Sequence, residues 1–420
     1  MKIAIVGTGI SGLISAYLLN SIHEVTLFEA ESWIGGHTHT VPVTFEEDVH
    51  WVDTGFIVFN DKNYNNLNKL FNLLSIPVQD SCMSFSVTCE KTGLVYSGSN
   101  LNGFFAQRRN IVEPSFYKFF YEIQRFRVLS LKFLSNKQDS SETLNEFLSK
   151  NKFSDFFVKK YLIPMLSAIW SNPKEKILDT NVVFFMNFLN NHGMLSITGR
   201  PVWKTVVGGS HVYVNKMTIP FRSKIYLQHK VTQVVLNKNS VTVNCESRNR
   251  IEEMKFDKVI LAVHSDQAIK LIKDPEDLVQ RTVGKIEYQK NEVVLHCDER
   301  CLPPVRRAHA SWNYVIPKNE SNKPILTYNM NKLQNISSKK PLLVSLNSEK
   351  YIDPKKIIEK FSYSHPIFNK DIINIQKQFN EVNTPENRIF FCGAYWGNGF
   401  HEDGLNSGIE VAKRLGGKWG

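Results

Sequence analysis

The sequence predicts an α/β fold made of two parts that interleave along the chain. Three observations support this prediction. The first 30 residues read as strand, turn, helix and strand; strand-like runs recur in the middle of the chain and near its carboxyl end; and residues 101–190 follow a mostly helical pattern rich in Phe. Strands that alternate with helices are typical of α/β proteins, and the helical stretch indicates an inserted second domain.

The composition is that of an ordinary globular protein. The chain has 420 residues, of which 42% are hydrophobic and 22% charged, which excludes disorder, collagen-like repeats and a disulfide scaffold. Lys and Arg number 51 against 40 Asp and Glu, so the net charge is +11. This excess suits a phosphate cofactor, a carboxylate substrate or an acidic membrane surface. Because it is spread along the chain, no nucleic-acid partner is expected.

The six cysteines are scattered, and only Cys297 and Cys301 lie close together in the sequence. A lone Cys-x3-Cys pair makes a poor zinc site, so no metal site is expected. Unclustered cysteines of this kind are typical of a reducing cytoplasm.

The uncharged stretch 3–22 has two possible interpretations, a hydrophobic targeting or membrane segment and a folded element. Hydropathy alone would make it a signal peptide or a membrane span. However, three glycines interrupt the stretch, and its periodicity changes from β-like to helical at residue 10. A strand–turn–helix accounts for both facts, so the mature protein is expected to begin at Met1.

The remaining elements follow from hydrophobic periodicity. A first helix is expected over about 10–21 and a last one over about 404–415. The strand-like runs after the first strand are 24–30, 231–237, 241–246, 258–263, 293–297, 325–330, 342–347 and 389–393.

The turn after the first strand has the pattern of a dinucleotide site. Gly7 permits a tight turn, Gly9 lets the backbone approach a pyrophosphate, and Gly12 lets the helix pack close to the strand. Glu29 ends the second strand, where a carboxylate accepts hydrogen bonds from ribose hydroxyls. The same carboxylate disfavours a 2′-phosphate by charge repulsion. The motif therefore predicts a Rossmann-like unit that binds the adenosine of NAD or FAD.

Motifs at both ends of the chain give more specific information than the dinucleotide pattern alone. WIGGHTHT (33–40) and DTGF (53–56) follow the first unit, and GAYWGNGFHEDGLNSG (393–408) lies near the carboxyl end. With these motifs the chain resembles the flavin-containing amine oxidase superfamily, which includes monoamine oxidases, protoporphyrinogen oxidase and phytoene desaturases. Within that group it is most similar to a bacterial branch of FAD-dependent amine-oxidase-like proteins associated with lipid modification.

The resemblance implies non-covalent FAD and a set of cofactor-binding residues. On the ADP half and along the pyrophosphate these are Gly7, Gly9, Ser11, Gly12, Glu29, Gly35, Gly36, His37, Thr38 and Gly393, with Val231 on the strand that holds the adenine. Toward the isoalloxazine ring they are Thr54, Gly55, Phe56, Phe400, Asp403, Gly404 and Leu405. The last three open the final helix, where Asp403 also fits a plain N-cap.

The chain departs from the family pattern in ways that bear on the chemistry. His37 stands where relatives carry a basic residue, most often Arg, so a permanent cation near phosphate is lost. Ala394 replaces an acid, and Phe400 replaces a Tyr of the aromatic cage that orients amines, which argues against simple amine oxidation. No second GxGxxG unit is found, which argues against a reductase fed by a pyridine nucleotide.

Three polar residues are the predicted catalytic candidates. His401 lies two residues before the expected start of the helix at the flavin, and His309 and Asn313 lie near SWNY (311–314) in the presumed substrate half. The aromatic and basic stretch 104–134 leaves two interpretations open. It is either an amphipathic surface helix that meets anionic lipid or admits acyl chains, or a core helix with a solvated basic face.

The predicted organisation has an FAD-binding domain made of 1–75, 200–272 and 375–420, and a substrate-binding domain of mixed sheet and helices made of 76–199 and 273–374. The expected activity is that of an FAD-dependent oxidoreductase that abstracts hydride from a hydrophobic, lipid or fatty-acyl, substrate, by desaturation or double-bond isomerisation. The alternatives are a flavin amine oxidase that produces aldehyde and peroxide, and a non-catalytic flavoprotein partner of a lipid methyltransferase. The expected location is the cytoplasm, with peripheral contact at the inner membrane face and a lipid-modifying enzyme as partner.

Overall fold

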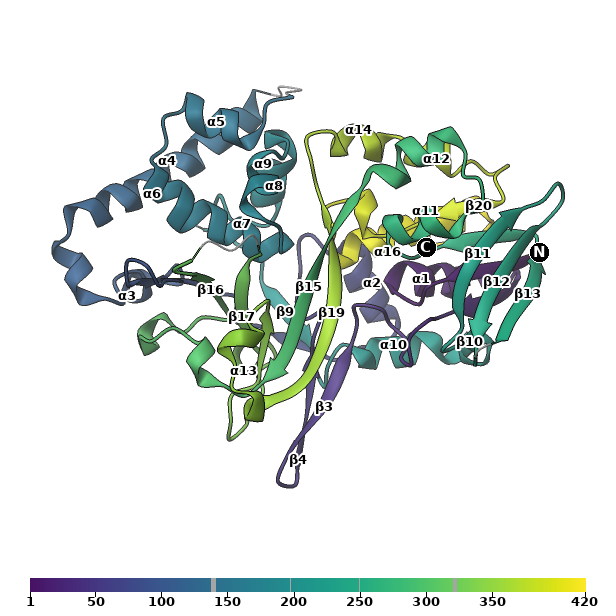
Figure 1. Ribbon diagram of the computed structural model, residues 1–420, viewed down its shortest axis with the longest axis horizontal. Helices are drawn as coiled ribbons and strands as arrows, with labels where there is room; N and C mark the ends of the chain where they lie inside the picture. The colour runs from purple at the N-terminus through teal and green to yellow at the C-terminus, as the bar shows by residue number, and fades with distance from the viewer. Residues whose placement is uncertain (137–140, 197, 249, 320–322) are drawn as a thin grey trace.

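The structure of the protein is a computed structural model that describes residues 1–136, 141–196, 198–248, 250–319 and 323–420. A five-stranded parallel sheet forms the base of the part that carries both chain ends (Figure 1). In spatial order its strands are β10 (Ile225–Tyr226), β2 (Glu24–Phe28), β1 (Lys2–Val6), β14 (Lys258–Leu261) and β20 (Ile389–Phe391). The central place of β1 is the arrangement expected of a nucleotide-binding sheet.

Alternating side chains of β1 enter two different cores, as the period of a strand requires. Ile3 and Ile5 pack with the helices on one face, and Ala4 and Val6 pack with a small antiparallel sheet on the other. The helices are α1 (Ile10–Leu19), α2 (Asn65–Leu73), α10 (His211–Thr218) and α16 (His401–Arg414). The opposite face carries β11 (Lys230–Leu236), β12 (Val241–Ser247), β13 (Arg250–Phe256), α11 (Ser265–Leu271) and α12 (Asp277–Arg281).

A seven-stranded mixed sheet forms the second part. Its spatial order is β19 (Ile357–Ile367), β15 (Glu287–His296), β18 (Leu343–Leu346), β17 (Ile325–Asn329), β16 (Trp312–Ile316), β7 (Phe85–Cys89) and β8 (Leu94–Ser97). Two smaller sheets lie beside it, the hairpin of β3 (Thr40–Phe45) and β4 (Asp48–Asp53), and the sheet of β5 (Phe59–Asn60), β9 (Trp203–Val206) and β6 (Val78–Asp80). In Figure 1 the hairpin projects downward from the junction of the two parts.

An aromatic helical layer adjoins this sheet at the left of Figure 1. It consists of α3 (Leu101–Phe104), α4 (Pro114–Ser135), α5 (Leu144–Lys150), α6 (Asp155–Phe157), α7 (Ile163–Trp170), α8 (Lys174–Leu178) and α9 (Val182–Asn191). The short helices α13 (Met330–Leu333), α14 (Ile372–Lys377) and α15 (Phe379–Val382) complete the fold. Within the described ranges, no helix combines the length and apolar character needed to cross a membrane.

The predicted fold class, a Rossmann-like domain interleaved with a mixed sheet and helices, is confirmed. One boundary in the predicted site is corrected, because the last helix begins at His401 and not near Gly404. The division into an FAD-binding and a substrate-binding domain at the stated residues stays a prediction.

Candidate active site

The turn between β1 and α1 is shaped by close backbone contacts. A Cβ on Gly7, whose φ is +98°, would lie 2.8 Å from the Ala262 carbonyl oxygen, and one on Gly12 would lie 2.1 Å from that of Gly7. Gly9 differs, because a Cβ there would meet nothing within 4 Å. Two of the glycines therefore allow the fold to close, and the third leaves open space at the start of the helix.

Glu29 lies buried at the end of β2, beside this turn. Its Oε2 accepts hydrogen bonds from the backbone N–H of Thr8 at 2.9 Å and from the Thr8 hydroxyl at 2.5 Å. The Glu29 carbonyl accepts from His229 at 2.8 Å, which brings the start of β11, with Val231, next to the end of β2. The predicted ribose and adenine contacts are thus neighbours.

The helices α1 and α16 begin at the same edge of the parallel sheet. A Cβ on Gly404 would lie 3.0 Å from Ile10, and one on Gly408 would lie 2.4 Å from the carbonyl oxygen of Ser11. Later residues of α16 contact later residues of α1, so the two helices run parallel. Neither N-cap provides a side-chain hydrogen bond. The amino ends of α1 and α16 thus lie at one edge of the sheet, where backbone N–H groups not used within the helices can bind anionic groups.

The loop after β2 lies against the turn. A Cβ on Gly36 would lie 3.1 Å from the Cα of Gly9, and one on Gly55 would lie 2.2 Å from the His37 carbonyl oxygen. The Phe56 N–H donates to that same carbonyl at 2.8 Å. Close packing therefore brings the predicted pyrophosphate segment and the predicted ring segment into contact.

His401 is the predicted catalytic residue that the structure brings to this loop. Its ring stacks on Phe56 with centroids 3.8 Å apart, and its Nε2 shares a 2.7 Å hydrogen bond with the Tyr213 hydroxyl. Tyr213 in turn bonds to the Thr38 hydroxyl at 2.7 Å. Burial, together with the charge of His37, lowers the pKa of His401 to about 3. The imidazole is therefore neutral at pH 7.

Asp403 has a different position from the one predicted. It is the third residue of α16, and its Oδ2 accepts the Phe400 N–H at 2.9 Å, so it is not the N-cap residue itself. Burial raises the pKa of this carboxyl to about 7. Because a negative charge at the amino end of a helix is favourable, the carboxylate and the helix support each other.

Phe400 joins an aromatic wall built from α7 and α9. Its ring stacks on Phe188 with centroids 5.0 Å apart, and Trp170 and His192 lie at 6.4 and 5.7 Å. Burial lowers the pKa of His192 to about 4. The wall is thus apolar and uncharged at neutral pH.

The other two catalytic candidates lie elsewhere. The His309 ring bonds to the Pro303 carbonyl at 2.9 Å. The Asn313 amide bonds to Ser86, Ala310 and Thr327 at 2.8–3.1 Å. All these contacts lie within the seven-stranded sheet and its loops, and they support a structural role for both residues.

Sequence reasoning missed Tyr213, His264, Tyr363 and His365, which lie next to predicted residues. No spacing in the sequence joins them to the glycine motifs, because they come from α10, α11 and β19. Only the tertiary fold brings these segments together.

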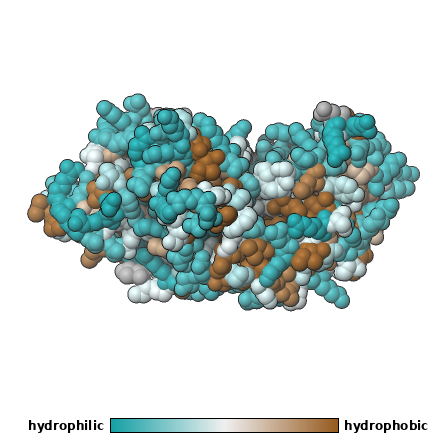
Figure 2. All heavy atoms as spheres, turned by 90° about the horizontal axis from the view of Figure 1, so that it is seen from below, coloured by the Kyte–Doolittle hydropathy of each residue, from teal (hydrophilic) through white to brown (hydrophobic). Residues whose placement is uncertain are grey.

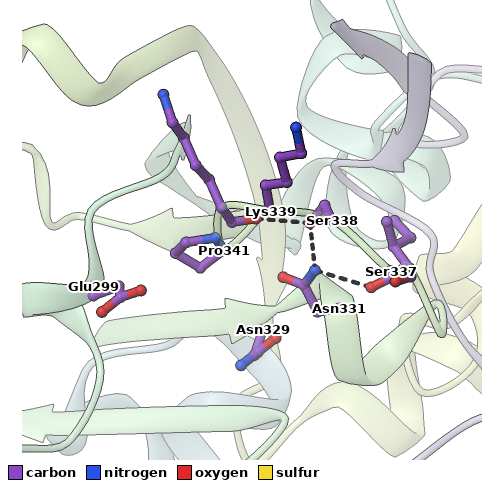
Figure 3. Close-up of a pocket in the computed structure, with 9 residues that line it drawn as sticks. Glu299, Asn329, Asn331, Ser337, Ser338, Lys339 and Pro341 are labelled. Carbon is purple, nitrogen blue, oxygen red and sulfur yellow. Dashed lines mark hydrogen bonds between the residues drawn. The ribbon is translucent and has the colours of Figure 1, made fainter. Parts of the chain in front are cut away.

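A separate surface hollow of about 420 Å³ lies between α13 and β18 (Figure 3). Its lining includes Glu299, Asn331, Lys339 and Lys340, and none of the predicted cofactor-binding residues. It is therefore not the predicted nucleotide site.

The residues at the sheet edge fit FAD on three structural observations. Gly9 leaves space that a side chain would fill. The Nε2 atom of His37 is buried without a hydrogen-bond partner. The starts of α1 and α16 have no side-chain hydrogen bond from their N-cap residues and would offer their remaining free N–H groups to a diphosphate and to a flavin carbonyl.

Comparison with known proteins decides the family. The family model for flavin containing amine oxidoreductases matches residues 10–330. The chain belongs to this family. It is an FAD-dependent oxidoreductase, as the sequence predicted.

Individual relatives are more distant. A 41-residue segment, 9% of the chain, is 56% identical to tryptophan 2-monooxygenase of Allorhizobium ampelinum, but it spans only 6% of that protein. Among solved structures, cyclohexylamine oxidase from Brevibacterium oxydans has a TM-score of 0.67 at 13% identity, with 99% of both chains covered. A CLA-producing fatty acid isomerase from P. acnes has a TM-score of 0.69 at 14% identity, with 98% of both chains covered. At such identity the likeness shows the fold alone.

Proposed function

We propose that this flavoprotein abstracts hydride from a hydrophobic, lipid or fatty-acyl, substrate, with desaturation or double-bond isomerisation as the result. The observation that carries the proposal is the aromatic wall of Phe400, Phe188 and Trp170 beside the neutral imidazole of His401. A wall of this kind binds an alkyl chain by burial of apolar surface. The fold shared with a fatty acid isomerase supports the same substrate class.

Each part of the site has a proposed role. Bound FAD supplies the hydride acceptor. The start of α16 stabilises negative charge through its free amides. His401 is held in place by its stack on Phe56 and its bond to Tyr213, and it positions substrate without contributing a charge. The aromatic wall excludes water from the alkyl chain.

The test is an anaerobic titration of the purified protein with unsaturated fatty acids, phospholipids and amines, followed in the visible spectrum. We expect lipids, but not amines, to bleach the oxidised-flavin band near ~450 nm. Bleaching by amines alone would replace the proposal with amine oxidation. If nothing bleaches the band, double-bond migration in the recovered fatty acid separates an isomerase from a non-catalytic flavoprotein.

A matched pair of variants tests the wall. Phe188→Leu removes the stack on Phe400 and is expected to lower kcat/KM for an acyl substrate by about fivefold, in line with the loss of roughly 1 kcal/mol of aromatic contact. Phe133→Leu removes a similar ring contact with Phe147 between α4 and α5 and should leave kcat/KM unchanged. Equal effects of both variants would argue for a general loss of packing.

A surface of the helical layer supports the proposed peripheral membrane contact. One face of α4 is buried, and the other exposes an apolar stripe that includes Tyr121 and Val128, which are 64% and 65% exposed. Val112, just before α4, is 82% exposed. Lys118 and Lys132 are exposed on the same helix, and its one acid, Glu122, is buried against Ser154. Basic and apolar groups together favour anionic lipid.

The apolar patches on the underside of the molecule suit lipid less well (Figure 2). That face includes the hairpin of β3 and β4, whose tip carries Glu46, Glu47 and Asp48. These acids would repel an anionic membrane. The stripe on α4 is therefore the proposed contact, and the lipid-modifying enzyme partner stays a prediction.

We expect wild-type protein to sediment with vesicles that contain phosphatidylglycerol, and to do so less at high salt. The double substitution Tyr121→Asp with Val128→Asp should abolish most of this binding and leave the flavin spectrum unchanged. Ile251→Asp on β13, a site that is 74% exposed, is the control for added charge. Sedimentation of the double variant at the wild-type level would contradict the proposed surface.

A further inference from the structure

Four histidines from four segments of the chain meet beside the nucleotide turn. The His37 ring lies 5.5 Å from that of His264 and 5.7 Å from that of His365. His401 is near enough for the charge of His37 to influence its titration. No group of His, Cys, Asp and Glu in the described part of the chain is arranged to hold a metal ion, so metal binding does not explain this cluster.

His37 is the member whose hydrogen bonding is incomplete. Its ring donates to the Ser364 backbone carbonyl, while Nε2 is buried and has no partner. The donor is therefore Nδ1, and in a neutral ring Nε2 carries a lone pair. A lone pair cannot donate to an anion, whereas a protonated Nε2 can.

The position of His37 places it next to the dinucleotide turn. It follows Gly36, whose backbone packs on Gly9. His264 follows Val263, whose side chain lies 3.0 Å from where a Cβ on Gly7 would be. The imidazoles thus border the edge where α1 begins and where a diphosphate binds.

Within the described ranges, the groups that face His37 include no carboxylate that could hold a proton on its ring. They are the rings of His264 at the N-cap of α11, Tyr363 and His365 on β19, and His401 on α16. The nearest carboxylates act on neighbouring tyrosines instead. Burial and the charges of Glu359, Glu31 and Asp53 raise the pKa of Tyr363. Burial and the charge of Asp266 raise the pKa of Tyr288, whose ring stacks on that of His264. Burial lowers the pKa of His37 to about 4, so without an anion the ring is neutral at pH 7.

We propose that His37 takes up a proton when FAD binds, so that its Nε2 donates to the diphosphate and the affinity for FAD falls as pH rises. The inference rests on the nucleotide site described above and deepens it. A permanent cation would bind FAD equally well at all pH values. An imidazole links cofactor loading to pH, since the anion stabilises the protonated ring.

The experiment is dilution of the holoenzyme at a series of pH values from 6 to 8.5 and constant ionic strength, with released FAD measured by fluorescence. For one linked proton, the wild-type Kd is expected to rise by up to about tenfold per pH unit at pH values between the pKa of the free imidazole, about 4, and that of the FAD-bound one, and to level off above the latter. His37→Arg and His37→Gln should both lose this dependence, with Gln the weaker binder at pH 6. His39→Gln, a neighbouring imidazole that bonds to the Tyr363 hydroxyl at 3.0 Å, should keep it.

A wild-type Kd that does not change with pH would overturn the proposal, as would an unchanged slope in both His37 variants. Titration of FAD itself would give the same slope in every variant, so the comparison excludes it. A wild-type protein that never retains FAD would overturn the nucleotide site as well, which separates the two failures.

Discussion

Gly9→Glu should yield a folded protein that has lost FAD. Gly9 has a φ of −63°, which any residue adopts, and its Cβ direction points into open space, so a side chain fits without strain. A carboxylate there would oppose the diphosphate at the start of α1. One like-charge contact at ~4 Å and an effective dielectric of about 20 costs about 4 kcal/mol, or roughly a thousandfold in affinity. Absorbance near ~450 nm measures the loss of FAD, and the melting temperature shows whether the protein remains folded.

Gly12→Ala is the contrasting variant at the same turn. Its Cβ would lie 2.1 Å from the Gly7 carbonyl oxygen, so the helix would have to move away from the strand. We expect this smaller side chain to lower the melting temperature more than Gly9→Glu does. Retention of FAD by the Gly9→Glu protein would place the diphosphate elsewhere and remove the basis of the site.

The local parts of the fold were predictable from sequence because their patterns are local. The run from Lys2 to Leu19 changes from strand to helix at its glycines, and the structure has β1 and α1 there. The buried runs at β14 and β20 were also found, because strands of a parallel sheet are short and continuously apolar.

Other elements carry no such pattern. The longest strand, β19, contains Glu359, Lys360 and two serines, and it forms because it pairs along its length with β15. The hairpin of β3 and β4 mixes exposed, half-buried and buried residues, with no regular alternation along β4, and its register depends on pairing from Thr40 to Asp53. Long-range pairing of this kind leaves little trace in periodicity.

The residues of the candidate site also divide into those that local sequence patterns predict and those that only tertiary packing brings together. Gly7, Gly9, Gly12 and Glu29 lie within one continuous segment whose spacing has a physical reason, so sequence reasoning could name them. The partners of His37 and His401 could not be named, because Tyr213 and His365 reach them only through tertiary packing. The resemblance led to Phe400, but the stack on Phe188 required the structure.

The buried histidines should make the protein unfold in mild acid. In six of them burial is the main cause that lowers the pKa to about 3 or 4: His37, His192, His264, His296, His365 and His401. Each binds a proton in the unfolded chain near pH 6.5 but not in the folded one. The stability that these neutral rings contribute is therefore present above pH 6.5 and is lost as pH falls toward 4.

Carboxyl groups whose pKa is raised by burial act in the opposite direction, and Asp53 and Asp403 have the large shifts. Burial raises the pKa of Asp53 to about 6 and that of Asp403 to about 7, so both gain protons in the folded state and add stability as pH falls through those values. His37 is left out of the balance because FAD binding is proposed to protonate it. Five protons against two leave a net uptake of about three on unfolding, or about 4 kcal/mol per pH unit. Because a typical domain is stable by only about 5–15 kcal/mol, we expect unfolding near pH ~5.

The test measures circular dichroism and flavin release as a function of pH. Two variants should shift the pH midpoint of unfolding in opposite directions. His296→Gln, which lies away from the glycine motifs and keeps a polar group near the Ser345 hydroxyl, should move the midpoint to lower pH by roughly 0.5 units, since one fewer proton drives unfolding. Asp53→Asn should move it to higher pH, because a compensating proton is lost. If both substitutions shift the midpoint in the same direction, the imidazoles are not the cause, and general destabilisation explains the acid sensitivity instead.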